Sequence, residues 1–354
     1  MADFRTPARD HYADITNRII TALEAGTAPW RRPWDPNKVP SGGPRNGVSG
    51  HRYRGINTLL LGMTPEMFAT GDPRWMSFIQ AQEKGWQVRK GEKATTIFFF
   101  KQVELRGDGH VDDGEDVKTV PVLRSYPVFH ASQIDGIPAY IPPSVVEAPW
   151  RTPESASVIV ARSGVGLREG GDRAFYSPST DHIQMPPRIA FKSPEGWAST
   201  ILHELGHWSG HPSRLDRNLT GRFGTQAYAM EELRAELASA FIGNELGIPA
   251  GIDNHASYLS SWLDVLRKDK REIFRASADA QKIADYLLGF HPLYAQQLTK
   301  ENTAPDEPAP APAPTPIHIP VGPMPAHVRR SLGLDPKPIA IEEPAPLAVM
   351  GYRR

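Results

Sequence analysis

Apolar residues in the first 130 positions of this 354-residue chain recur at helical spacing and then give way to a β-rich run. The helical spacing predicts helices over residues 12–23, 56–63 and 77–84. The aromatic and β-branched run at 95–103 predicts a strand, and residues 117–130 supply its return strand. The first part of the chain is therefore expected to be a mixed α+β domain.

A mainly helical pattern starts near residue 154. Two short strands joined by a Pro-Ser-Thr-Asp turn are predicted within residues 173–187. Helical spacing predicts helices over residues 156–163, 197–209, 229–246, 255–268 and 270–288. We therefore expect an α+β protein whose second domain is mainly helical.

Proline marks the boundaries between these parts. Five prolines between residues 138 and 153 are typical of a linker. From residue 301 the composition changes to Ala-Pro repeats, which cannot bury enough apolar surface to fold. The predicted division is a first domain over 1–137, a linker over 138–153, a second domain over 154–300 and a disordered Pro/Ala-rich tail over 301–354.

Composition excludes several classes of protein. Cysteine is absent, so histidine and carboxylate are the strong protein ligands left for a metal. The N-terminus carries no apolar signal run, and no stretch approaches the length of a membrane span. We expect a soluble, cytoplasmic protein with no membrane partner.

Charge is distributed unevenly, although the formal net charge is zero. Residues 1–101 contain 15 Lys and Arg against nine Asp and Glu, and a long basic loop rich in proline and glycine is predicted over 29–50. An acidic loop is predicted over 104–116. The first domain is thus the basic part of the chain.

Aromatic residues are interleaved with these basic residues. Single-stranded DNA needs both, because phosphates attract Lys and Arg while unpaired bases stack on aromatic rings. The alternative is that the tryptophans are core residues beside an ordinary solvated surface. The candidate DNA-binding residues are Trp30, Arg31, Arg32, Trp34, Arg45, Arg52, Arg54, Trp86, Arg89, Lys90 and Lys93.

The run His203-Glu204-Leu205-Gly206-His207 is the strongest chemical motif. On a helix, His203 and His207 share one face and can bind one Zn²⁺, while Glu204 lies beside that face as a candidate general base. Gly206 in a helix interior indicates close approach of another backbone. The alternative is a surface helix with two solvated histidines, which the apolar neighbours of the motif disfavour.

A third ligand is expected on the alanine-rich helix predicted downstream. Glu232 and Glu236 are four residues apart and face one way, whereas Glu231 points about 100° away and is interpreted as solvated. In zincins with a downstream glutamate ligand, a second carboxylate four residues later often orients a ligand histidine. By that resemblance Glu232 is the ligand and Glu236 the supporting carboxylate. The alternative is an ordinary charged helix face paired with Arg234 and other bases.

Several blocks of residues follow one another along the chain: 12–19, Pro29-Trp30, 55–57, Gly85-Trp86 with 89–93, 176–186, 203–211, 231–241, 254–258 and Trp262-Leu263. In this order the blocks resemble the ArdC antirestriction proteins of conjugative plasmids. The resemblance implies an N-terminal domain that binds single-stranded DNA and is similar to a domain of plasmid TraC primases. It also implies a C-terminal zinc metallopeptidase fold, and protection of transferred DNA against restriction enzymes.

By this resemblance His203, His207 and a downstream glutamate hold Zn²⁺, with Mn²⁺ as the other metal considered, and Glu204 is the general base. Candidates to steady an oxyanion are Tyr176, His211 and His255, for each of which a structural hydrogen bond is an equal alternative.

Two function classes follow from these features. One is a DNA-binding antirestriction protein whose metallopeptidase domain cleaves a protein substrate, such as a host factor. The other is a binding protein in which the metal is structural. The presence of Glu204 favours the first, because a structural site needs no general base. A primase-associated accessory protein fits the first domain, but no polymerase carboxylate constellation accompanies it.

Overall fold

The described part of the chain begins with a helix of 14 residues, followed by short helices and strands. The structure is a computed structural model, and it describes residues 10–26, 28–30, 43–104, 119–141, 153–221, 225–248 and 256–303. The elements of the first region are α1 (His11–Glu24), β1 (Arg45–Asn46), α2 (Ile56–Gly62), α3 (Pro65–Thr70), β2 (Arg74–Met76), α4 (Phe78–Glu83), β3 (Gln87–Val88), β4 (Thr95–Glu104), β5 (Thr119–His130), the 3₁₀ helix η2 (Ala131–Gln133) and β6 (Ile134–Asp135).

The main sheet of this region has the strand order β1-β2-β5-β4. Strands β1 and β2 are parallel and the other pairs are antiparallel. The β4–β5 ladder runs from Thr95 opposite Val128 to Glu104 opposite Thr119, which confirms the predicted return strand. Strands β3 and β6 form a separate antiparallel pair.

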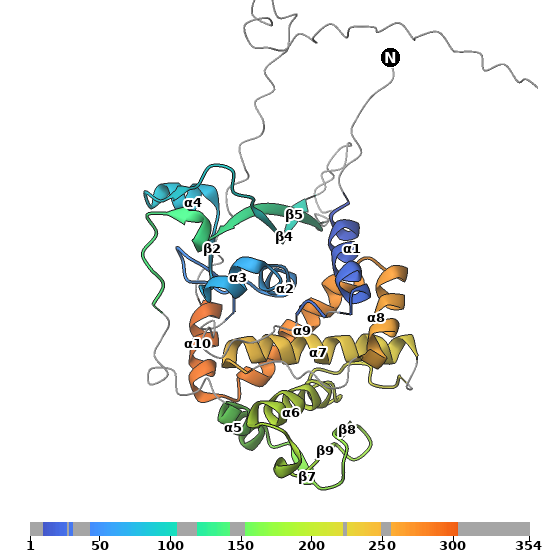
Figure 1. Cartoon of the computed structure of the whole chain (residues 1–354). Helices are drawn as coiled ribbons and strands as arrows, with labels where there is room; N and C mark the ends of the chain where they lie inside the picture. Colours follow the sequence, from blue (N-terminus) through green and yellow to red (C-terminus); the bar gives the residue numbers. More distant parts are fainter. Residues whose placement is uncertain are drawn as a thin grey trace, which may run out of the picture. The chain divides into compact units, whose positions relative to one another are not determined.

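The second region is mainly helical. Its strands form a three-stranded sheet of order β7-β9-β8 beside the helices (Figure 1). Its elements are α5 (Pro153–Ser163), β7 (Gly166–Glu169), β8 (Phe175–Ser177), β9 (His182–Met185), the 3₁₀ helix η3 (Arg188–Ala190), α6 (Pro194–Trp208), α7 (Gln226–Leu246), α8 (Ala256–Lys268), α9 (Glu272–Leu288) and α10 (Pro292–Thr303).

The largest hydrophobic core is shared by both regions. Helix α7 lies at its centre and packs against α6, α8 and α9 (Figure 1). From the first region, Tyr12 of α1 meets Phe274 with ring centroids 4.7 Å apart, and Trp30 meets Trp262 at 5.6 Å. Both described regions accordingly belong to one compact unit.

Helices α6 and α7 approach each other closely at a glycine. A Cβ added at Gly206 would lie 3.2 Å from the Cα of Ala235, so only glycine fits without displacing the backbone of α7. The Ser239 hydroxyl donates to the Ser199 carbonyl oxygen at 3.2 Å across the same interface. The predicted close approach at Gly206 is thus confirmed, and it brings the two motif-bearing helices together.

The predicted α+β class is confirmed, and each predicted helix and strand has a counterpart with slightly shifted ends. Periodicity missed α3, α10 and the short strands β1, β2, β3, β6 and β7. Strands of two to four residues offer too few positions for an alternating pattern. The basic loop, the acidic loop, the linker and the tail lie largely outside the described residues. None of the described helices combines the length and apolar character needed to cross a bilayer.

Candidate metal centre

The two motif histidines lie on the buried helix α6. Ser193 caps the helix by accepting a hydrogen bond from the Gly196 N–H at 3.1 Å, and Pro194 occupies the first turn. His203 and His207 are one turn apart, and their Nε2 atoms are 3.2 Å from each other. The two imidazoles therefore present nitrogen atoms to one point.

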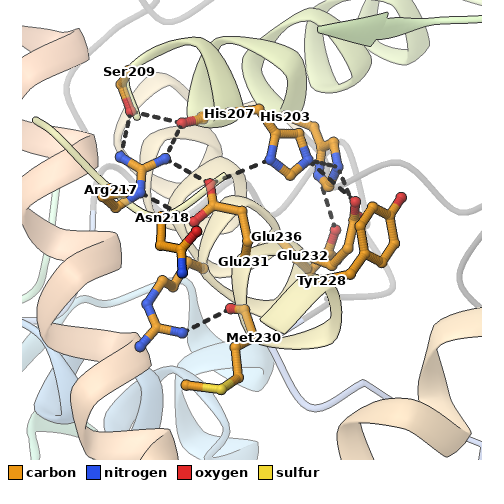
Figure 2. Close-up of polar contacts among 12 residues, drawn as sticks. His203, His207, Ser209, Arg217, Asn218, Tyr228, Met230, Glu231, Glu232 and Glu236 are labelled. Atoms are coloured by element: carbon orange, nitrogen blue, oxygen red, sulfur yellow. Dashed lines mark hydrogen bonds and ion pairs between the residues drawn. The ribbon is translucent and has the colours of Figure 1, made fainter. Parts of the chain in front are cut away.

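Glu232 on α7 completes this cluster. Its Oε2 lies 3.5 Å from His203 Nε2, and its Oε1 lies 3.5 Å from His207 Nε2 (Figure 2). One ligand atom from each of the three residues lies within 4.8 Å of the others. Two neutral imidazoles and one carboxylate are a donor set suited to Zn²⁺, and a cluster of this size fits a single ion.

The electrostatics of the cluster are those of mutually stabilising charges. Burial alone raises the pKa of Glu232, but hydrogen bonds from His203 and Tyr228 and the charges of both histidines lower it to about 2. Burial disfavours the protonated form of His203, yet its contacts with Glu232 and Glu236 raise its pKa well above the usual value. A cation is therefore favoured where these three side chains meet.

Glu236 lies on the far side of His203. Its Oε2 is 3.7 Å from His203 Nδ1, and its Oε1 accepts a hydrogen bond from Trp30 Nε1 at 3.3 Å. A carboxylate on the second nitrogen of a ligand imidazole fixes the orientation of the ring. The arrangement matches the supporting role expected for Glu236, and Trp30 adds a contact from the first region.

Glu231 occupies the corresponding position beside His207, which corrects the expectation that it is solvated. It is 8% exposed, and its Oε1 lies 3.3 Å from His207 Nδ1. Burial raises the pKa of Glu231, but His207 and Arg217 outweigh that effect and lower it. The expectation failed because α7 is buried on most of its circumference, so a residue rotated by about 100° still faces protein.

Arg217 holds Glu231 in place and was missed by the sequence analysis. Its guanidinium donates to Glu231 Oε1 at 2.8 Å and Oε2 at 3.2 Å, and to the Gly206 carbonyl oxygen at 2.6 Å (Figure 2). It also donates to Ser209 Oγ at 2.9 Å. Arg217 lies in an irregular loop after α6, so no periodic pattern pointed to it.

Glu204 lies on α6 beside the cluster and is 7% exposed. Burial raises the pKa of Glu204, and the charges of His203 and His207 partly oppose this rise. The backbone of Tyr176 on β8 also forms a hydrogen bond with Glu204. Strand β8 therefore lies next to α6.

The three oxyanion candidates are placed differently. The Tyr176 hydroxyl donates to Asp181 Oδ1 at 2.8 Å, and burial together with this bond raises the pKa of Tyr176. His211 Nδ1 lies 2.8 Å from Ser213 Oγ, and His255 lies outside the described residues. Tyr228, which the sequence analysis did not single out, forms a hydrogen bond with Glu232 and lies beside the cluster (Figure 2).

The candidate DNA-binding residues are dispersed. Trp30 is 5% exposed, so its ring is in the core, as in the alternative interpretation of the tryptophans. Arg52 pairs with Glu245 at 3.2 Å and Arg54 with Asp285, which ties both to helices of the second region. The remaining candidates are Arg45, half-buried in β1; Trp86, half-buried; Arg89, Lys90 and Lys93, exposed near one turn; and Arg31, Arg32 and Trp34, outside the described residues.

Two family models match the chain. The N-terminal domain of the anti-restriction factor ArdC matches residues 9–129, and a zincin-like metallopeptidase matches residues 154–279. The metal cluster lies within the second match.

Individual relatives agree with these matches. DNA primase TraC of Escherichia coli is 44% identical over 325 residues, covering 87% of this chain but 29% of the primase, so the chain spans less than a third of that protein. Protein y4eC of Sinorhizobium fredii is 39% identical, with 81% of this chain and 95% of that protein covered.

The crystal structures of the antirestriction ArdC protein from the R388 plasmid share the fold. The metal-free form has a TM-score of 0.66 at 36% identity and covers 81% of this chain and 99% of that one. The Mn(II)-bound form has a TM-score of 0.63 at the same identity.

Proposed function

Because this chain belongs to the family of ArdC antirestriction proteins, we propose that it binds incoming single-stranded DNA and protects it from restriction. We further propose that its zincin-like domain is a metallopeptidase whose metal is held by His203, His207 and Glu232. The observation that carries the second proposal is the convergence of these three ligand groups beside Glu204.

The zincin-like domain implies zinc, and the donor set of the cluster fits it. The Mn(II)-bound ArdC relative makes manganese the second metal to test. A divalent ion at this position would supply Lewis-acid activation of a carbonyl group and of water.

The protein side chains would orient the metal ligands and transfer the proton. Glu231 and Glu236 orient the two histidines through their Nδ1 atoms. Burial raises the pKa of Glu204 toward neutral pH. A general base is most effective when its pKa lies near the pH at which the enzyme works. Glu204 would accept a proton from the attacking water and return it to the leaving amine of a peptide.

Protection of DNA needs only contacts with phosphates and bases, and no protein substrate. We therefore propose that the basic first region protects DNA by coating it, independently of peptide hydrolysis. A protein whose metal is purely structural would protect equally well, but the position of Glu204 beside the cluster favours a catalytic centre.

The deciding experiment is plasmid transfer into a restricting recipient with the parent protein and the Glu204→Gln variant. We expect equal protection by both, with single-stranded DNA binding measured in parallel. Loss of protection by Glu204→Gln with unchanged DNA binding would contradict coating and make proteolysis the mechanism.

A further inference from the structure

An aromatic ring can stack on an unpaired base only if one face reaches solvent. Trp30 and Trp75, two tryptophans of the basic region, are 5% and 0% exposed. Among the described residues of the first region, the exposed aromatic side chains are Phe78, at 43%, and Phe100, at 56%. The structure therefore directs the search for a base-stacking ring from Trp30 and Trp75 to Phe78 and Phe100.

Phe78 lines a surface hollow together with two of the candidate DNA-binding residues. The hollow measures about 710 Å³, within the usual range for ligand sites. Phe129 and Val88 supply further apolar lining, and Arg89, Lys90, Glu92 and Asp135 supply charged lining. The apolar lining suits the flat face of a base, and the basic residues suit the adjoining phosphate.

Two segments that line the hollow are held in place by hydrogen bonds. Phe78 begins α4, which Ser77 caps by accepting from the Gln80 N–H at 3.2 Å, while Gln80 Oε1 accepts from the Ser77 N–H at 3.0 Å. In the segment that contains Arg89 and Lys90, the Arg89 N–H donates to the Gln133 carbonyl oxygen at 3.0 Å. A preformed site avoids part of the ordering cost of binding.

The charges of the two basic residues are used differently. The Arg89 guanidinium donates to Glu92 at 2.7 Å, to Asp135 at 3.3 Å and to the Ser132 carbonyl oxygen at 2.6 Å, so its charge is offset by two carboxylates. Lys90 is exposed and forms no ion pair within the described part of the chain. A phosphate would therefore be held by Lys90 rather than by Arg89.

We propose that this hollow holds one unpaired base of single-stranded DNA, stacked on Phe78, with the adjoining phosphate at Lys90. The proposal rests on the proposed DNA binding and names the place on the surface where it occurs. Arg89 is a positioning residue, because its side chain links Glu92, Asp135 and the Ser132 carbonyl oxygen beside the hollow.

The test is fluorescence anisotropy of the full chain with a labelled oligothymidylate of about 10 nucleotides, and with the same backbone lacking bases. Phe78→Leu should weaken binding of the oligothymidylate about 5- to 100-fold and leave binding of the abasic strand unchanged. Phe78→Trp should restore it. Phe100→Leu, an exposed ring outside the hollow, is the matched control and should bind like the parent.

Lys90→Gln should weaken binding of both strands and reduce the slope of log affinity against log salt by about 0.7. Lys282→Gln, which removes one exposed charge from α9, is its control and should leave the slope unchanged. Parental affinity in Phe78→Leu, or an equal loss of affinity in Phe100→Leu, would overturn the proposal that the hollow binds a base. The proposal that the protein binds single-stranded DNA would stand. Failure of the parent to bind either strand would instead overturn the proposed DNA binding, and with it the proposed role of the hollow.

Discussion

The metal centre and the basic turn at residues 89–93 hold their charged groups in opposite ways. At the metal centre, each histidine contacts a buried carboxylate, and each of these carboxylates is itself held, Glu231 by Arg217 and Glu236 by Trp30. At the turn, Lys90 and Lys93 are exposed. Charges in a buried network depend on one another, so single changes there should have large effects, whereas exposed charges contribute small and salt-dependent effects.

The largest expected effect is loss of the metal. His203→Ala and His207→Ala should each abolish the binding of about one divalent ion per chain, because the two ligands that remain cannot retain it. Elemental analysis after dialysis measures this directly. His211→Ala, a histidine four residues further along the chain, should keep the metal. Full metal content in both ligand variants would refute the assignment.

The next effect concerns catalysis alone. Glu204→Gln should retain metal and DNA binding and lower any peptide hydrolysis by about 10²- to 10⁴-fold, the usual contribution of a general base. Cleavage of an unstructured protein substrate by the zinc-loaded chain, with a chelator-treated sample as background, is the measurement. Hydrolysis that is equal in variant and parent would assign the base to another residue.

The supporting carboxylates should give intermediate effects. Glu231→Gln and Glu236→Gln should each weaken metal affinity about 10- to 100-fold, whereas Glu232→Gln should abolish binding. Competition with a metal-sensitive dye separates these outcomes. If Glu236→Gln abolished binding while Glu232→Gln only weakened it, the roles of the two residues would be exchanged.

A smaller effect tests the link between the two regions. Trp30→Phe keeps the ring in the core and removes the hydrogen bond to Glu236, so metal affinity should fall several-fold, in line with about 1 kcal/mol for one hydrogen bond. Trp75→Phe changes a buried tryptophan elsewhere in the first region and is the matched control. Equal affinities in the two variants would show that the metal centre is independent of Trp30.

The smallest effect contrasts a histidine of the first region with those of the metal centre. Burial lowers the pKa of His130, although its contact with the Asp72 carbonyl oxygen opposes this. The neutral form is thus favoured in the fold, and its stabilising effect is present above the unfolded pKa of about 6.5 and is lost as pH falls below it. Urea unfolding at neutral and mildly acidic pH should show a weaker pH dependence in His130→Gln than in the parent. An unchanged pH dependence would contradict the prediction.

The sequence by itself determined the helices, the long hairpin and the two histidines of the candidate metal centre. These features are local, because residues four apart on a helix share a face whatever the rest of the chain does. The sequence also predicted the close approach at Gly206. Glycine destabilises a helix interior, and close packing against another backbone explains why it is found there.

Only the tertiary structure decided which groups surround these local features. Glu231 is buried because α7 is enclosed by other helices, and Arg217 reaches it from an irregular loop that no period describes. Trp30 looked like a DNA contact in a basic segment, but its ring is in the core because α8 offers Trp262 and α7 offers Glu236 as partners. Burial and long-range contacts depend on how the elements pack, so the local spacing of residues does not predict them.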